Sequence, residues 1–282
     1  MLSASSRIIT RFGVTFLADI VAATRRRVVE CRTNSDLREL ERQAAAHNPR
    51  GFRRALESAS NSGVAVIAEL KKASPSRGVI RRDFDPAKLA GELEQAGAAA
   101  LSVLTDEEFF QGSLANLMTA SASTRIPCLR KDFIVDEFQI LEARANRADA
   151  ILLIVAALEQ AELVSLVREA SVIALDVLCE VHDKEQLQRA LEADCNLIGV
   201  NNRDLRTFKI SLETAFGLAE RIPAGVFAVA ESGIDSGADI ARLRGAGYKG
   251  FLIGESLMRA KSAGEALKSL LVEAVLPVVS TR

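Results

Sequence analysis

Charged and amide side chains that can move protons recur directly after short apolar runs of this sequence. Glu69 and Lys71 end or follow the first such run, Lys131 follows another, and Glu180 and Asn201 lie at the ends of two more. General acid–base catalysis uses these types of group. An unpaired ion in a protein interior costs several kcal/mol, so their concentration at the ends of apolar segments predicts ion pairs or a bound ligand. Structural ion pairs explain any single position as well, but for the whole set we favour a catalytic site.

The apolar runs alternate with amphipathic stretches, and this alternation predicts parallel strands joined by helices. We predict eight strands, over 64–69, 99–104, 127–130, 150–154, 174–180, 197–200, 226–230 and 250–253. Helices are expected between them, for example over 86–95 after Asp85 and over 159–170. Eight such units fit an α/β fold of the (β/α)8 TIM-barrel type. A doubly wound open sheet is the alternative, because periodicity does not show closure.

The segment before the first strand is predicted to be helical. Apolar residues recur at helical spacing over 16–31, and 36–46 has a similar pattern. We therefore divide the chain into an N-terminal extension over 1–15, which need not be ordered, and a single barrel domain over 16–282 with N-terminal helices in about 16–62.

Composition is that of an ordinary globular protein and argues against several classes of partner. The 282 residues include 36 Lys and Arg against 37 Asp and Glu, for a formal net charge of −1. This balance does not supply the positive field that nucleic acid or a membrane surface requires, so we expect neither as a partner. The longest apolar run, over 150–158, is about half the length that a membrane-spanning helix needs.

Cysteine and histidine form no recognisable pattern. The four cysteines and two histidines make no CxxC or HxxxH pair, so we expect no metal site, no disulfide framework and reduced thiols in the cytoplasm. His182 follows Glu180 closely and could act as a base, but a lone histidine in a loop is more often a bystander.

Two glycine-containing turns follow the last two predicted strands. Ser232 and Gly233 come after one strand, and Gly254 and Glu255 come after the other. Barrels often bind phosphate with these two loops, through backbone N–H groups that glycine lets a ligand approach. The GxGxxG pattern over 245–250 precedes a strand, so we interpret it as a helix end and turn, not as a dinucleotide fingerprint.

Six blocks at these positions resemble indole-3-glycerol-phosphate synthase, an enzyme family of tryptophan biosynthesis. The blocks are AELKKASPSRG (68–78), LSVLTDEEFFQGS (101–113), CLRKDFIVDEFQI (128–140), GVNNRDL (199–205), AVAESGI (228–234) and FLIGESLM (251–258). The resemblance implies a (β/α)8 barrel with N-terminal helices and a carboxy-lyase activity without a cofactor. The implied substrate is 1-(2-carboxyphenylamino)-1-deoxyribulose 5-phosphate, and the products are indole-3-glycerol phosphate, carbon dioxide and water.

The resemblance also implies roles for the catalytic residues. Lys131 corresponds to the general acid of ring closure and Glu180 to the base. Lys71, held by Glu69, is expected to contact the substrate and assist the loss of water, and Asn201 to hydrogen-bond its polar groups. Which lysine acts in which step stays open at this point.

The same comparison implies substrate contacts from several strand ends. The expected substrate-binding residues are Ser74, Phe109, Phe133, Arg203, Leu205, Glu231 and Ser232, with the two phenylalanines and the leucine packing on the aryl ring. The expected phosphate-binding residues are Ser232, Gly233, Gly254 and Glu255. Only the backbone of Glu255 is assigned to phosphate, and its acidic side chain is expected to point away. The segment 70–80 is longer than most βα loops, so we expect a lid over the substrate.

Three alternatives stay open from the sequence. Lys131 could form a Schiff base in an aldolase acting on a ketose phosphate. The barrel could be a non-catalytic partner of another pathway enzyme, or a related isomerase of the same pathway. For the favoured function we expect a phosphorylated small molecule as the ligand, a cytoplasmic location, and a monomer or weak homodimer.

Overall fold

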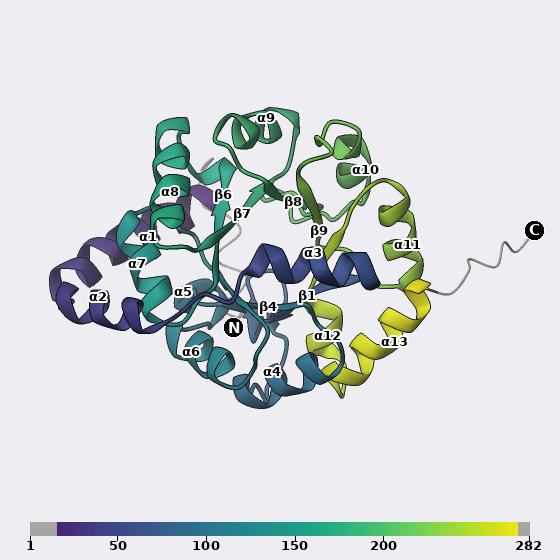
Figure 1. Ribbon diagram of the computed structural model, residues 1–282, viewed down its shortest axis with the longest axis horizontal. Coiled ribbons are helices and arrows are strands. Elements are labelled where there is room, and N and C mark those ends of the chain that lie inside the picture. Colours follow the sequence, from purple (N-terminus) through teal and green to yellow (C-terminus); the bar gives the residue numbers. More distant parts are fainter. Residues whose placement is uncertain (1–15, 276–282) are drawn as a thin grey trace, which may run out of the picture.

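A computed structural model shows a closed barrel and describes residues 16–275. The extension predicted over 1–15 lies outside the described residues. Eight parallel strands pair in the order β1-β10-β9-β8-β7-β6-β5-β4, and β1 closes the ring by pairing with β4 (Figure 1). The strands are β1 (Ala65–Leu70), β4 (Ala100–Leu104), β5 (Cys128–Lys131), β6 (Ala150–Ile154), β7 (Asp176–Val181), β8 (Leu197–Asn201), β9 (Phe227–Glu231) and β10 (Gly250–Ile253). The TIM-barrel prediction is confirmed, and the open sheet is excluded.

A ring of helices covers the outside of the barrel (Figure 1). Asp85 shows why one of them begins where it does, because its side chain accepts hydrogen bonds from the N–H groups of Ala87 and Lys88 while Pro86 occupies the first turn. The helices after β1 are α4 (Pro86–Gln95), α5 (Glu107–Phe110), α6 (Leu114–Ala122), α7 (Glu137–Ala145), α8 (Gln160–Val172), α9 (Lys184–Glu192), α10 (Glu213–Ala219), α11 (Gly237–Gly245), α12 (Glu255–Arg259) and α13 (Ala263–Val275), with the 3-10 turn η2 (Val155–Ala157) after β6.

Three N-terminal helices precede the barrel, and the third closes one end of it. They are α1 (Phe16–Asn34), α2 (Leu37–Ala46) and α3 (Phe52–Ser62), and α3 crosses the barrel in Figure 1. Phe52 and Leu56 of α3 are fully buried in one apolar cluster with Ala65 and Phe227, which begin β1 and β9. The end of the barrel at which the strands begin is therefore filled by apolar side chains, and a ligand must enter at the other end.

Helix α1 is tied to that opposite end by ion pairs. Arg27 contacts Asp106, at 3.6 Å, and Asp132, at 3.3 Å, which follow β4 and β5. Within residues 16–275, no helix is both long and apolar enough to cross a membrane.

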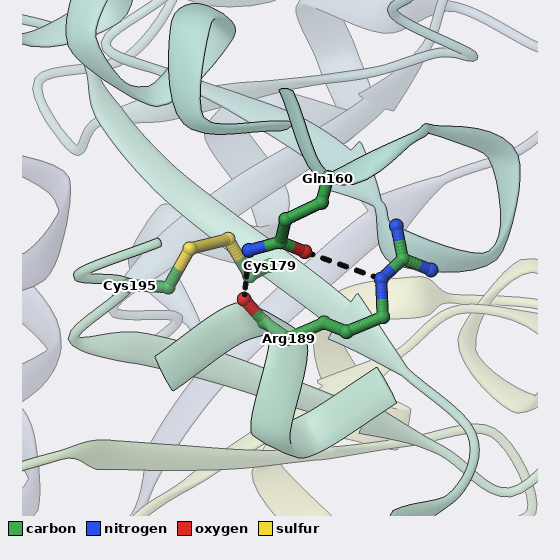
Figure 2. Close-up of a disulfide and its surroundings, with 4 residues drawn as sticks. All are labelled: Gln160, Cys179, Arg189 and Cys195. Atoms are coloured by element: carbon green, nitrogen blue, oxygen red, sulfur yellow. Dashed lines mark hydrogen bonds between the residues drawn. A yellow bond between two sulfur atoms is a disulfide. The ribbon is translucent and has the colours of Figure 1, made fainter. Parts of the chain in front are cut away.

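The structure contains a disulfide, which the spacing of the cysteines does not predict. It joins Cys179 of β7 to Cys195, which lies just before β8. Figure 2 shows it beside Gln160 and Arg189, whose side chains are joined by an Arg189 Nε–H hydrogen bond to Gln160 Oε1 of 3.2 Å. The expectation of no disulfide is wrong for this pair, because neighbouring parallel strands bring the two Cα atoms to 6.4 Å, within the reach of a disulfide.

The predicted lid segment has regular structure of its own. Strands β2 (Ala73–Ser74) and β3 (Gly78–Val79) pair as an antiparallel two-stranded sheet. This small sheet carries Ser74 to the rim of the barrel. Closure of the segment over a ligand stays a prediction.

Candidate active site

A cavity of about 320 Å³ opens at the carboxyl ends of the strands. Its wall contains every site residue expected from the sequence except Phe109. The residues brought together are Glu69, Lys71, Ser74, Lys131, Phe133, Glu180, Asn201, Arg203, Leu205, Glu231, Ser232, Gly233, Gly254 and Glu255. They come from six of the eight strands and the loops after them, so closure of the barrel is what assembles them.

Lys131 lies at the centre of the charged floor of this cavity. Its Nζ is 3.4 Å from Glu180 Oε2 and 3.8 Å from Glu231 Oε2. Burial alone would lower the pKa of this lysine, but its acidic neighbours, Glu180 first and then Glu231 and Glu69, outweigh burial and raise it. Lys131 is therefore an ammonium group that can donate a proton.

Two of the surrounding carboxyl groups are held in their ionised form. Burial alone would raise the pKa of Glu69, but Lys71 and Lys131 lower it, and Lys71 Nζ bonds Glu69 Oε1 directly. Burial acts in the same sense on Glu180, and there the Lys131 ammonium and the His182 ring lower the pKa. Glu180 can therefore accept a proton.

Glu231 differs from these two carboxyl groups. Burial and repulsion from Glu180 raise its pKa to about 8, although Lys131 attracts it. One oxygen, Oε1, is buried and has no hydrogen-bond partner among the described residues. Glu231 is thus a protonated carboxyl group at neutral pH, able to donate a hydrogen bond to Glu180 or to a ligand.

Gly254 has no side chain, and this leaves room for the side chain of Glu69 in the cavity floor. A Cβ on this residue would lie 2.5 Å from Glu69 Oε1 and 2.9 Å from Glu69 Cβ, closer than carbon side chains come to other atoms. Any larger residue at 254 would displace Glu69 and with it the contact to Lys71.

Three arginines lie at the rim of the cavity, next to the predicted phosphate-binding loops. Glu255 Oε1 lies 3.1 Å from Arg77 Nε and 3.1 Å from an Arg259 nitrogen, and its Oε2 lies 3.6 Å from an Arg203 nitrogen. The carboxylate of Glu255 is therefore paired with three arginines of the rim. Their guanidinium groups also suit an anionic ligand. Arg77 and Arg259 line the cavity and were not among the expected site residues, although both lie in or next to blocks that carried the resemblance.

Apolar side chains form the remaining wall. Phe110 and Phe133 have ring centroids 6.3 Å apart, and Leu152, Ile154 and Leu205 lie beside the cavity with them. This combination suits an aromatic ring bound next to charged groups.

Phe109 does not line the cavity, and its neighbour Phe110 does. Both belong to the short helix α5, whose N-terminus is capped by Asp106 through the N–H groups of these two residues. Consecutive helical residues point about 100° apart, so only one of the pair can face the ligand. The sequence alone did not show which one.

A buried network behind the floor holds the end of β5. Asp132 accepts hydrogen bonds from Thr105 Oγ1, at 2.6 Å, and from Arg130, at 3.1 Å. Burial would raise the pKa of Asp132, but Arg130 and Arg27 lower it, so the carboxylate stays charged and paired. The backbone next to Lys131 is therefore fixed by contacts that reach as far as α1.

This fold and cavity define a class of protein. A TIM barrel whose mouth holds an ammonium between carboxyl groups, an aromatic wall and an arginine rim is built for acid–base chemistry on an anionic aromatic substrate. The comparisons with known proteins agree. Residues 17–270 match the model of the family described as indole-3-glycerol phosphate synthase. A relative from Koribacter versatilis (strain Ellin345), named indole-3-glycerol phosphate synthase, is 57% identical over 255 residues, covering 90% of this chain and 98% of that protein. The chain belongs to the indole-3-glycerol phosphate synthase family, whose members are decarboxylating lyases of tryptophan biosynthesis.

Solved structures with low sequence identity share the fold. A mandelate oxidase mutant matches with a TM-score of 0.59 and 16% identity, covering 83% of this chain and 92% of that one. Thiamine phosphate pyrophosphorylase from Pyrococcus furiosus matches with a TM-score of 0.57 and 17% identity, covering 77% of this chain and 99% of that one. At such identities these matches support the barrel alone.

Proposed function

We propose that the cavity binds 1-(2-carboxyphenylamino)-1-deoxyribulose 5-phosphate and converts it to indole-3-glycerol phosphate, carbon dioxide and water. The observation that carries the proposal is the position of Lys131, a buried ammonium between two carboxyl groups that differ in protonation. A proton donor and a proton acceptor in contact are what a ring closure followed by a dehydration requires.

Lys131 is proposed as the acid of ring closure. As the aryl carbon attacks the ketone carbon, the carbonyl oxygen gains negative charge, and the ammonium next to it stabilises and protonates that oxygen. Carbon dioxide then leaves and restores the aromatic ring. Because the pKa of Lys131 is raised by its carboxyl neighbours, the proton is present at neutral pH when the substrate arrives.

Glu180 and the Glu69–Lys71 pair are proposed to act in the dehydration. Glu180 is ionised and takes the proton whose removal forms the new double bond. Lys71, held by Glu69, donates to the departing hydroxyl group, which leaves as water. Substituting each lysine separately and looking for accumulation of the ring-closed, undehydrated intermediate distinguishes the two steps, since only loss of the second acid should trap it.

The remaining residues are proposed to bind the substrate. Its phosphate lies against the backbone of Ser232, Gly233, Gly254 and Glu255, with Arg203 or a neighbouring rim arginine near the anions. The aryl ring lies on Phe110, Phe133 and Leu205. Ser74 Oγ supports this placement, because it is buried without a partner among the described residues and lies in the cavity wall. Asn201 and Glu231 complete the polar floor.

The Schiff-base aldolase is disfavoured by the charge of Lys131. Formation of a Schiff base requires a neutral amine, and the surrounding carboxyl groups raise the pKa of this lysine. Borohydride added with the substrate is expected to leave the mass of the protein unchanged. A covalent adduct at Lys131 would favour the aldolase.

We further propose one barrel domain over 16–282, a monomer or weak homodimer, no nucleic-acid partner and a cytoplasmic location. The near-neutral charge of −1 supports the absence of a nucleic-acid partner. The Cys179–Cys195 disulfide is the feature least expected of a cytoplasmic enzyme, so counting free thiols in protein isolated under alkylating conditions tests the location as well.

The function is tested by incubating the protein with the carboxyphenylamino sugar phosphate and following indole fluorescence and carbon dioxide release together. The chain has no Trp and one Tyr, so background emission is low. Equimolar formation of both products supports the proposal. Absence of both from a folded protein contradicts it.

A further inference from the structure

His182 lies against the proposed base and is not used by the mechanism above. It is the first residue after β7, and its side chain is 12% exposed. Its Nε2 atom lies 3.5 Å from Glu180 Oε1. Lys131 Nζ approaches the other oxygen, Oε2, at 3.4 Å. Each oxygen of the Glu180 carboxylate therefore has its own nitrogen partner.

The hydrogen-bond network around His182 determines which ring nitrogen carries a proton. Gln186 Nε2 donates to Asp183 Oδ2 at 2.9 Å, and Gln186 Oε1 accepts from the backbone N–H of His182 at 3.0 Å. Both contacts require the same orientation of the Gln186 amide, since a carboxylate only accepts and a backbone N–H only donates. The same Oε1 lies 3.2 Å from His182 Nδ1. An amide oxygen cannot donate, so Nδ1 must carry the hydrogen.

This assignment leaves Nε2 to interact with Glu180. In the neutral ring Nε2 would present a lone pair to the carboxylate, which is repulsive, whereas in the protonated ring it presents N–H and forms an ion pair. The atom is buried and has no hydrogen-bond partner in the part of the chain that the structure describes. The ring therefore favours the ionised form of Glu180, whose pKa it lowers.

We propose that His182, oriented by Gln186 and Asp183, is a positioning residue that holds Glu180 as an ionised carboxylate in the geometry needed to accept the substrate proton. The proposal rests on the role of Glu180 as the base. It adds a residue that acts through Glu180 and does not itself touch the substrate.

The other charged and polar groups around Glu180 do not replace this contact. Lys131 on β5 lies at Oε2, Asn201 on β8 hydrogen-bonds the carboxylate, and Glu231 on β9 can donate to it when protonated. Glu69 on β1 attracts the same Lys131. Without His182, Oε1 loses the ring nitrogen that lowers the pKa of Glu180, so Glu180 is expected to take up a proton at higher pH than before.

The test compares His182→Asn and Gln186→Leu with the control Gln188→Leu. Gln188 lies on the same helix, is exposed and contacts Glu192, away from the cavity. His182→Asn is expected to lower kcat about tenfold near neutral pH with little change in KM, and to move the acidic limb of the kcat profile to higher pH. Gln186→Leu is expected to have a smaller effect in the same direction, and Gln188→Leu none.

A profile of His182→Asn that overlays the wild-type profile would overturn the proposal. If that variant does not fold, Gln186→Leu carries the same test, because it leaves the histidine in place and removes only the group that orients it. Loss of activity equal at all pH values indicates a merely structural role and also counts against the proposal.

A second measurement does not depend on activity. The chain has two histidines, so His47→Gln assigns the imidazole nitrogen resonances of His182 in a nitrogen-15 spectrum. We expect a protonated Nδ1 in the spectrum of the folded protein, because Gln186 Oε1 accepts from it. A bare Nδ1 refutes the network. A wild-type protein inactive on the carboxyphenylamino sugar phosphate, by contrast, refutes the proposed function and not the network.

Discussion

Replacing Glu231 by Gln is predicted to stabilise the folded protein, and to do so more at neutral pH than in acid. The side chain is 1% exposed, and burial with repulsion from Glu180 raises its pKa from 4.5 to about 8. The folded chain thus keeps a proton on Glu231 after the unfolded chain has released it. The contribution of this proton to the free energy of unfolding is fully present below about pH 4.5 and is lost as the pH rises to about 8.

The size of the effect follows from this difference. The difference between the folded and unfolded pKa of Glu231 corresponds to a loss of roughly 5 kcal/mol in the free energy of unfolding once the pH exceeds 8. Roughly 3 kcal/mol of this has been lost by pH 7. Glutamine has the same volume, does not titrate, and can donate an N–H to Glu180 where the protonated carboxyl donates O–H. For a chain of this size the midpoint of thermal unfolding should rise by about 10 °C at pH 7.

Thermal unfolding followed by circular dichroism at pH 5, 7 and 8 measures the change. Glu185→Gln, the same substitution at an exposed position of α9, is the control and should show no pH-dependent difference from wild type. If the gain in Glu231→Gln is the same at pH 5 as at pH 8, the protonated state assigned to Glu231 is wrong.

Three further substitutions test other parts of the structure. Glu255→Gln removes the carboxylate that neutralises the rim arginines, so KM should fall about threefold in low salt and less in high salt, measured by steady-state kinetics; an increase in KM would contradict this. Gly254→Ala should push Glu69 from its place and lower kcat by about a hundredfold, whereas an unchanged kcat would mean that the Glu69 contact is dispensable. Cys195→Ser opens a disulfide across 16 residues, which should cost roughly 3 kcal/mol and several degrees in the unfolding midpoint, with Cys31→Ser as the unaffected control.

Much of the fold was predictable because each βα unit carries a local signal. The strand over 150–154 and the helix over 86–95 begin and end as predicted, since an apolar run and an Asp85–Pro86 helix start depend only on nearby residues. The predicted strand ends then identified the cavity, because all carboxyl ends of a parallel barrel meet at one rim.

What the sequence did not predict depends on contacts between distant segments. The Cys179–Cys195 disulfide requires β7 and β8 to be neighbours, and neither cysteine lies in a recognised spacing. The choice between Phe109 and Phe110 depends on how a one-turn helix sits on the barrel. His182 looked like a bystander because its partner Glu180 lies two residues away on the same strand end, where only the direction of the side chains shows the contact.

The most direct test of the account compares the turnover of Lys131→Ala and Glu180→Gln with that of wild type in the indole fluorescence assay. Circular dichroism should show that both variants remain folded. Each variant is expected to lose about a hundredfold or more in kcat, because each removes one partner of the acid–base pair in the cavity. Turnover close to wild type in either folded variant would contradict the assignment of the chemistry to this pair.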